Sequence, residues 1–257
     1  MSPVKVHPPK AKGLVMAMIP TYNESENIRQ VLDEILGLRL RFDLQALVVD
    51  DNSPDGTGPI VEDMARKDKR VHLLLRTKRR GRGAAGIDGF REALRLGADY
   101  VIEMDGDLSH QPAYITQLVD AAQIYDLVLG SRFVTGGKDA NRGLHRRFIT
   151  FLVRRFIRSR FGVRVEDASS GFRCFRREVL EAVDLDDLIS VGPSVVLEVL
   201  YKTHLLGYSI GEIPITFIDR EKGKTKLSFL TLVETLIMVI KFRKQYAGLR
   251  PVKPARA

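Results

Sequence analysis

The stretch that decides the fold is Tyr100-Val101-Ile102-Glu103-Met104-Asp105-Gly106-Asp107. Its first five residues are mostly apolar and predict a buried strand at residues 100–104. Two carboxylates one residue apart follow the strand and point at one locus, which is costly unless a cation neutralises them. Oxygen ligands suit Mg²⁺ or Mn²⁺, and these ions readily share their coordination shell with substrate phosphates. The alternative for this motif alone is a surface turn.

Two motifs of the same kind lie upstream. A predicted strand ending at Ile19 is followed by Pro20-Thr21-Tyr22-Asn23-Glu24, and one at residues 44–49 is followed by Asp50-Asp51-Asn52-Ser53. Ligands of open α/β sheets bind at the carboxyl edge of the strands. Three polar clusters on that edge favour recognition of a nucleotide's hydroxyls and base, with a metal for its diphosphate. Helix capping by Asn23 or Ser53 is the alternative for either motif alone.

The elements around these motifs alternate regularly. Helical patterns occupy residues 25–36, 57–67 and 84–96, and a further strand is expected at residues 71–75. A helix at residues 112–123 and a strand at residues 126–131 follow. This alternation predicts a parallel sheet with right-handed crossovers, and the less regular second half is expected to build the acceptor side.

The ordered set of motifs resembles the family 2 glycosyltransferases of GT-A fold, and within them the dolichyl-phosphate (polyprenyl-phosphate) mannose synthases. The resemblance runs from about residue 18 to residue 226. Gly106 stands where the family usually has Ala, and Thr225 where Ser is common; both changes are small. The motifs that carry it are Pro20-Thr21-Tyr22-Asn23-Glu24, Asp50-Asp51-x-Ser53-x-Asp55-Gly56-Thr57, Met104-Asp105-x-Asp107-Leu108-Ser109-His110, Gly130-Ser131-Arg132, Asp167-x-x-Ser170-Gly171-Phe172-Arg173 and Phe217-x-x-Arg220-x-x-Gly223-x-Thr225-Lys226.

The resemblance implies an α/β fold of the GT-A (Rossmann-like) type, with a mixed, mainly parallel sheet flanked by helices and a C-terminal amphipathic interface helix. We expect a disordered tail at residues 1–12 and a catalytic domain at residues 13–226. The domain divides into a nucleotide-sugar half at residues 13–110 and an acceptor half at residues 111–226. Residues 227–257 are expected to form the amphipathic helix and a basic tail.

The implied activity is transfer of mannose from GDP-mannose to dolichyl or polyprenyl monophosphate, dependent on Mg²⁺ or Mn²⁺ and inverting at the anomeric carbon. A lipid phosphate is already ionised at pH 7, so it needs positioning rather than a strong general base. His110 is accordingly interpreted as a local structural hydrogen-bonding group. One alternative is transfer from UDP-glucose or another nucleotide sugar. Another is a non-catalytic membrane- or nucleic-acid-binding protein on the same fold, against which the intact acidic pair argues.

The site residues implied by the resemblance fall into four groups, and the catalytic residues expected among them are Asp105, Asp107, Arg132, Arg220 and Lys226. Asp105 and Asp107 are the metal ligands, and the Arg220 and Lys226 pair is expected to close over the nucleotide phosphates. Arg132 and Arg146 are expected to bind the lipid phosphate. The nucleotide-sugar contacts are expected from Pro20, Tyr22, Glu24, Val48, Asp50, Asp105, Gly106, Asp107, Arg132, Arg220 and Lys226.

Basic charge is concentrated in two segments of a chain whose net charge is +9. Residues 142–160 hold seven arginines and no acidic residue, interleaved with apolar residues, and residues 241–257 add six basic residues. Such segments are typical of helices at an anionic membrane surface. A packed helix with a solvated basic face is the alternative. No helix-turn-helix, zinc-finger or RNP pattern is present, so no nucleic acid is expected.

Residues 227–240 are apolar at ten of fourteen positions, fewer than the roughly 20 that a span needs. We interpret them as a membrane-surface helix or as a docking face for a small membrane-anchor subunit, with packing on the domain as the alternative. The single cysteine, Cys174, indicates a reducing compartment. The first twelve residues lack a signal-peptide pattern. A cytoplasmic protein, peripheral on the cytosolic face of a membrane and without a transmembrane segment, is therefore expected.

Overall fold

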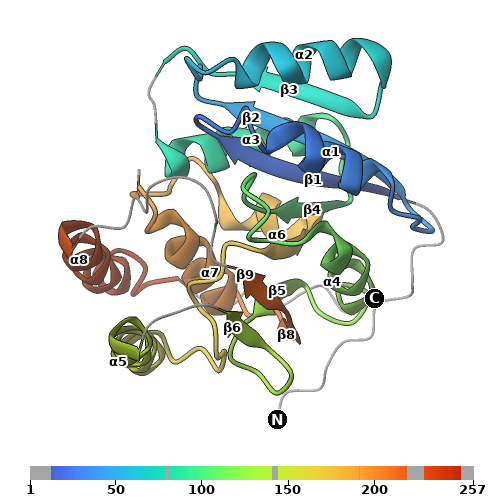
Figure 1. Cartoon of the computed structure of the whole chain (residues 1–257). Coiled ribbons are helices and arrows are strands. Elements are labelled where there is room, and N and C mark those ends of the chain that lie inside the picture. The colour runs from blue at the N-terminus through green and yellow to red at the C-terminus, as the bar shows by residue number, and fades with distance from the viewer. Residues whose placement is uncertain (1–12, 79–80, 141–143, 191, 219–228, 250–257) are drawn as a thin grey trace.

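The computed structural model describes residues 13–78, 81–140, 144–190, 192–218 and 229–249 (Figure 1). The predicted tail at residues 1–12 lies outside these residues. The chain folds as a mixed sheet with helices on both faces, as the sequence predicts. The carboxyl ends of the first strands point toward the left of Figure 1, where α3 begins.

The main sheet has seven strands in the order β3-β2-β1-β4-β7-β5-β8. Only β7 runs antiparallel to its neighbours, β4 and β5, and the other pairs are parallel. The strands are β1 (Leu14–Thr21), β2 (Asp43–Asp50), β3 (Val71–Leu75), β4 (Tyr100–Glu103), β5 (Leu127–Ser131), β7 (Arg173–Arg176) and β8 (Ile210–Pro214).

A second, two-stranded parallel sheet pairs β6 (Lys138–Ala140) with β9 (Thr216–Ile218). The sequence pattern of the less regular second half does not predict this pairing. Because β9 directly follows β8, the small sheet holds the segment after β5 beside the edge of the main sheet. The helices are α1 (Ile28–Leu36), α2 (Thr57–Lys67), α3 (Arg82–Arg95), α4 (Ile115–Ala121), α5 (Leu144–Phe161), α6 (Arg177–Val183), α7 (Val195–Leu205) and α8 (Phe229–Gln245), with a 3₁₀ turn η1 (Pro112–Tyr114) before α4.

The helix after β1 begins later than predicted. α1 starts at Ile28, because the chain first makes a turn in which the N–H groups of Asn27 and Ile28 both donate to the carbonyl of Glu24. Neither Asn23 nor Ser53 caps a helix: the N-caps are Asn27 for α1 and Gly56 for α2. The capping alternative for the two upstream motifs is therefore wrong.

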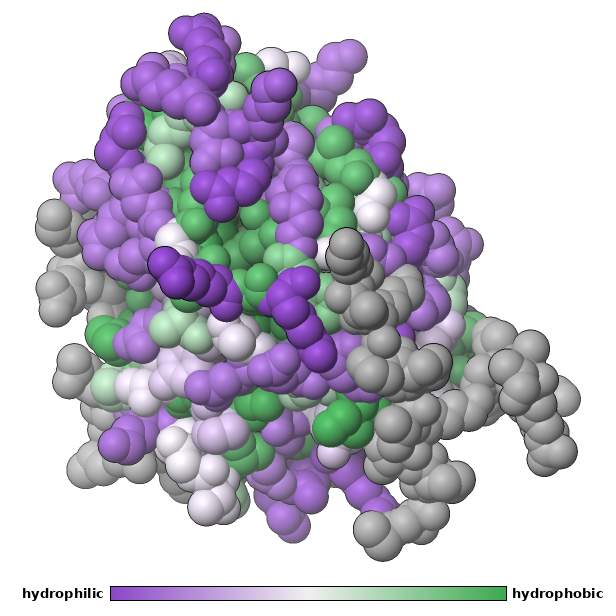
Figure 2. All heavy atoms as spheres, turned by 90° about the vertical axis from the view of Figure 1, so that its right-hand side faces the viewer, coloured by the Kyte–Doolittle hydropathy of each residue, from purple (hydrophilic) through white to green (hydrophobic). Residues whose placement is uncertain are grey.

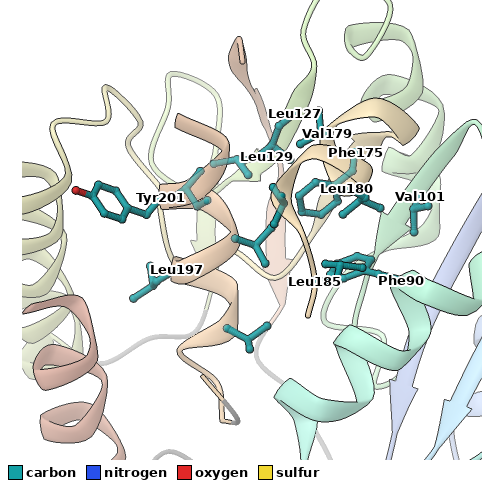
Figure 3. Packing of buried hydrophobic residues seen from close by; sticks show 14 of the residues in the cluster. Phe90, Val101, Leu127, Leu129, Phe175, Val179, Leu180, Leu185, Leu197 and Tyr201 are labelled. Carbon is teal, nitrogen blue, oxygen red and sulfur yellow. The ribbon is translucent and has the colours of Figure 1, made fainter. Parts of the chain in front are cut away.

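Two apolar clusters form the core, one on each face of the sheet. Figure 3 shows the larger one, where side chains of α3, α6 and α7 converge on β4, β5 and β7. Phe90 of α3 packs edge-on against Phe175 of β7 at 5.2 Å between ring centroids. Gly89 lets α3 lie directly on β1 and β2, since a Cβ there would come within 2.8 Å of Met18.

The C-terminal helix α8 packs on the domain through one side. Val239, Phe242 and Tyr246 are buried in the larger cluster, and the Tyr246 hydroxyl donates to the carboxylate of Glu198 in α7. The packing alternative is therefore correct for this side of the helix. Ile237 and Ile240 of α8 stay about half exposed.

The basic helix α5 lies next to α8, at the lower left of Figure 1, and is also anchored at one side. Ile157 and Phe161 are buried, whereas Phe151 and Leu152 are exposed. Among the residues that the structure describes, no helix combines the length and apolar character that crossing a membrane requires. Figure 2 shows the face at the right of Figure 1, where hydrophilic side chains surround smaller apolar areas.

Candidate active site

Three loops at the carboxyl edge of the sheet lie against one another, and the first two are hydrogen-bonded to each other. The Thr21 hydroxyl donates to Asp50 (2.8 Å), and the backbone N–H of Asn23 donates to the Ser53 hydroxyl (3.0 Å). Gly106 lies so close to β1 that a Cβ would come within 3.3 Å of the Thr21 side chain. The loops after β1, β2 and β4 therefore build one continuous site.

The backbone of these loops is strained in a way that marks the site. Asn23, Asn52 and Leu108 have φ angles of 61°, 53° and 63°, and they follow β1, β2 and β4 respectively. Leu108 has no local side-chain hydrogen bond of the kind that favours this conformation in Asn. Conformations of this kind cost about 1–3 kcal/mol each and cluster at functional sites.

The acidic pair, Asp105 and Asp107, lies in the loop that follows β4. Asp107 is nearly buried and accepts hydrogen bonds from the N–H (3.1 Å) and hydroxyl (2.5 Å) of Ser109. Asp105 is more exposed, at 28% of its side chain, and accepts a hydrogen bond from Arg82. In the described part of the chain, no three His, Cys, Asp or Glu residues are arranged to hold a metal ion. The two carboxylates fit a hard divalent cation whose remaining ligands come from substrate oxygens or water.

His110 supports the acidic loop. Its Nδ1 accepts the backbone N–H of Asp105 (3.0 Å), and its ring stacks on Phe172 at 5.0 Å. Burial lowers the pKa of His110, although Asp105 and Asp107 oppose this effect. A neutral ring that accepts at Nδ1 carries its proton on Nε2. His110 thus has the structural hydrogen-bonding role that the sequence analysis assigns to it.

Arg132, at the end of β5, is held by Asp167 in a two-pronged ion pair. Its Nε and Nη2 donate to the two oxygens of Asp167 at 2.7 and 2.8 Å, and its backbone N–H donates at 3.1 Å. Asp167 is fully buried, and only 12% of the Arg132 side chain is exposed. Burial disfavours the charged guanidinium, but the bond and charge of Asp167 outweigh it and raise the pKa of Arg132. Binding of a lipid phosphate by Arg132 stays a prediction.

The segment before β7 is built on a buried arginine that the sequence analysis does not assign to any role. Arg173 donates to the carbonyls of Ser170, Ala168 and Val196. Complete burial lowers its pKa to about 10, while Glu103 counteracts this effect. Glu103 faces Arg173 across the antiparallel β4–β7 pair, and burial raises the pKa of this carboxyl. Two sequence signals pointed to this pair: Arg173 ends one of the motifs that carry the family resemblance, and Glu103 is a charge within an otherwise apolar strand.

The residues predicted to contact the nucleotide sugar differ in how far they are buried. Pro20, Tyr22 and Glu24 are half-buried at the surface of the site, whereas the side chains of Val48 and Asp50 are completely buried. Contact of these five residues with a donor stays a prediction. Arg220 and Lys226 lie outside the described residues, as does the side chain of Arg146, whose backbone belongs to α5.

The amino-acid sequence matches one family model along most of this fold. Residues 16–184 match Glycosyl transferase family 2. The chain belongs to this family. The match covers the three loops, Arg132 and the Asp167–Arg173 segment, so the resemblance stated from the motifs is confirmed.

Three family 2 relatives align along most of the chain. An undecaprenyl-phosphate mannosyltransferase of Micrococcus luteus is 39% identical over 238 residues, which are 92% of this chain and 97% of that protein. A polyprenol monophosphomannose synthase of Mycolicibacterium smegmatis is 38% identical and covers 87% and 84%. A dolichol-phosphate mannosyltransferase of Pyrococcus furiosus is 34% identical and covers 90% and 64%.

A solved structure supports the GT-A-like fold of this family 2 chain. The glucosyl-3-phosphoglycerate synthase of Mycobacterium tuberculosis, crystallised with Mn²⁺, UDP-glucose and phosphoglyceric acid, superimposes with a TM-score of 0.64. The alignment covers 93% of this chain and 81% of that one at 19% identity. At this identity the comparison shows the shared fold alone, and it confirms the predicted fold class.

The burial of Asp50 in this family 2 site leads to a prediction with two measurements. One Asp50 oxygen accepts the hydroxyls of Thr21 and Ser53, and the other accepts the Ser53 N–H. Asp50→Ala would leave these buried donors without a partner, so we expect the free energy of unfolding to fall by about 3 kcal/mol. Since a donor contact would be made equally in ground and transition states, we also expect the donor KM to rise more than kcat falls.

Urea unfolding and steady-state kinetics measure the two effects. Asp43→Ala is the matched control, because Asp43 begins the same strand but is exposed, and it should change neither quantity. An unchanged KM with a collapsed kcat would contradict the predicted donor contact.

Proposed function

We propose that this family 2 glycosyltransferase moves mannose from GDP-mannose to the monophosphate of a polyprenol or dolichol. The observation that carries the proposal is the alignment with three proteins named for this type of transfer, one of them along 97% of its length. The site supports it, because the loops after β1, β2 and β4 meet beside an acidic pair.

Asp105 and Asp107 are the residues that would hold a divalent cation, Mg²⁺ or Mn²⁺. When bound, such an ion acts as a Lewis acid that neutralises charge on the diphosphate leaving group. The chain's own part is to fix the two carboxylates. Ser109 and the turn at Leu108 orient Asp107, and His110 holds the backbone of Asp105.

The acceptor phosphate needs cations and orientation. Arg132 at the end of β5 is our proposed phosphate ligand, through the guanidinium N–H groups other than the two that donate to Asp167. Asp167 holds this side chain in one orientation. Arg146, Arg220 and Lys226 complete our proposed set of phosphate-binding cations. Because the acceptor is ionised already, the neutral and hydrogen-bonded His110 has no proton to remove. Inversion at the anomeric carbon is proposed from the family resemblance.

One incubation tests the donor and the acceptor together. The protein is mixed with polyprenyl-phosphate-containing membranes and radiolabelled GDP-mannose, UDP-glucose or UDP-GlcNAc, and the label in the lipid phase is counted. We expect lipid labelling from GDP-mannose alone, and none in excess EDTA. Labelling from UDP-glucose instead would replace mannose by glucose in the proposal. No labelling from any donor would favour a non-catalytic binding protein.

A membrane surface is the proposed place of the reaction, because the acceptor's polyprenyl chain is embedded there. Four of the seven large apolar side chains that are exposed in the described part of the chain lie on α5 and α8. Basic side chains accompany them, among them Arg155, Arg158 and Lys241. Apolar residues beside positive charge suit an anionic surface such as the cytosolic face of a membrane. A small membrane-anchor subunit on the same helices is a second way to reach the lipid.

This proposal predicts salt-sensitive binding to vesicles. Attraction between basic residues and anionic lipids is screened as the Debye length falls from about 10 Å at 0.1 M salt to about 3 Å at 1 M. Binding to anionic vesicles, measured by co-sedimentation, should therefore drop steeply in high salt. Replacing Phe151 and Ile237 by Ser should weaken the vesicle binding that persists in high salt.

Ile124→Ser is the control, since Ile124 is exposed to a similar degree but follows α4. Equal binding to neutral and anionic vesicles at every salt concentration would contradict the electrostatic attraction. No vesicle binding, with activity on short soluble acceptors intact, would favour recruitment by a partner subunit.

A further inference from the structure

Arg82 is placed at the acidic pair by the way α3 begins. Gly81, just before the helix, has φ 138° and ψ 139°, a conformation that side chains rarely allow. Its backbone N–H donates to Asp51 at 2.8 Å, which ties the start of α3 to the loop after β2. Arg82 is the first residue of the helix, and its guanidinium reaches Asp105 just after the end of β4.

The guanidinium of Arg82 lies among the carboxylates at the end of β4. Its Nη2 donates to Asp105, and its Nη1 is 3.9 Å from the Glu103 carboxylate. Gly171 borders it on the other side, where a Cβ would come within 3.0 Å of Nη2. The charge of Asp105 is the main cause that raises the pKa of Arg82, with Glu103 and Asp107 adding to it against the effect of burial.

A divalent cation bound at Asp105 would compete with this guanidinium for one carboxylate. The Asp105 oxygen that accepts the Arg82 bond has less electron density to offer a metal, and two cations beside one carboxylate repel each other. A nucleoside diphosphate changes this balance in two ways. It supplies oxygen ligands for the metal, and it offers a second anion to which the planar fork of an arginine can bind.

We propose that Arg82 is the counter-ion that Asp105 exchanges for the divalent cation, so that the cation binds firmly only together with the donor's diphosphate. This inference rests on the proposed metal-dependent transfer. In this role Arg82 makes firm binding of the metal depend on binding of the donor. In the donor complex the released guanidinium contacts the diphosphate.

Binding of Mn²⁺ alone, measured by electron paramagnetic resonance without any sugar or lipid, tests the proposal. The wild-type chain should bind Mn²⁺ weakly, and GDP should tighten this binding at least about tenfold. Arg82→Gln should bind Mn²⁺ alone about tenfold more tightly than the wild type, because Asp105 loses its competing cation. The tightening by GDP should be correspondingly smaller in this variant.

Two matched variants test whether the effect requires loss of the positive charge at position 82 in particular. Arg91→Gln removes the same charge from the same helix, but Arg91 pairs with Asp88 and Asp186 at the surface. Its Mn²⁺ affinity should equal that of the wild type. Arg82→Lys keeps a cation at the site and should stay within about threefold of the wild type. Tightening in either variant as large as in Arg82→Gln would overturn the proposal.

An Mn²⁺ affinity in folded Arg82→Gln equal to that of the wild type would also overturn it. If circular dichroism shows that this variant does not fold, the wild-type titration still decides, because tight Mn²⁺ binding that GDP leaves unchanged contradicts the exchange. The result is distinguishable from failure of the proposed function, since the measurement contains no mannose and no acceptor. Normal mannose transfer with an unchanged Mn²⁺ affinity in Arg82→Gln would remove only the role of Arg82.

Discussion

Asp107→Asn should reduce sugar transfer by about 10³-fold or more while the protein stays folded. Loss of one carboxylate at a metal site removes several kcal/mol of charge stabilisation, and each 1.36 kcal/mol is a factor of ten in rate. The amide has the shape of the carboxylate and retains an oxygen that can accept from the N–H and hydroxyl of Ser109. The loop should therefore keep its geometry.

Transfer rate, Mn²⁺ titration in the presence of GDP and thermal unfolding measure this prediction together. We expect loss of rate and of metal affinity with little change in the unfolding temperature. Asp186→Asn is the control, because Asp186 is 83% exposed and pairs with Arg91 at the surface. Full activity of Asp107→Asn in excess EDTA would contradict a metal role for this residue.

The second large effect is expected at Asp167. Asp167→Ala should lower the free energy of unfolding by about 3–5 kcal/mol, because it leaves the Arg132 guanidinium largely buried and without its partner. The same change frees Arg132 from its fixed orientation, so transfer should fall as well. Urea unfolding gives the first quantity and the lipid-labelling assay gives the second.

Arg158→Gln provides the contrast. Arg158 pairs with Glu166, the neighbour of Asp167, but it is 52% exposed, and surface pairs contribute about 0–1 kcal/mol. A loss of stability in Asp167→Ala no larger than that in Arg158→Gln would contradict the role of the buried pair.

The Asp167–Arg132 pair also makes the free energy of unfolding depend on pH. Burial favours the neutral form of Asp167, but the hydrogen bonds and charge of Arg132 outweigh it, so the pKa of this carboxyl lies below its ordinary value. A depressed pKa contributes stability above the unfolded value, near 3.9, and this stability is lost as the pH falls through the lower folded value. Asp167→Ala should therefore lose less stability than the wild type on acidification below about pH 4.

Local patterns in the sequence predicted the elements that position the site. The helix at residues 57–67 and the strand at residues 71–75 are found with these bounds, because each is a regular apolar pattern ended by turn residues. The three polar motifs fall at strand ends for the same reason. Their approach follows from the parallel order of β1, β2 and β4, which alternation of strands and helices already implies.

Such local patterns could not predict which residues far apart in the sequence pair with each other. The bond of Arg82 to Asp105 joins positions 23 residues apart, and that of Arg132 to Asp167 joins positions 35 residues apart. A charged residue in a loop has the same local signature whether it faces water or a buried partner.

The C-terminal helix is a second case in which the local pattern could not identify the contact partner. An apolar stripe predicts a covered face, but it does not distinguish a lipid surface from the body of the domain. In the structure, Phe242 and Tyr246 are covered by the domain, while Ile237 is exposed.

The position of β7 sets an order in which the sheet can be completed. β1 to β4 pair only among themselves and with β7, so four strands can assemble once residue 103 has left the ribosome. β5 has only β7 and β8 as neighbours, and both are made later. At about 5–20 residues per second, the 42 residues from Arg132 to Arg173 take roughly 2–8 s to synthesise. During that interval the nascent chain carries a strand whose five residues are all buried in the finished fold but whose partner strands are missing, and this strand is the segment that a chaperone has most reason to bind.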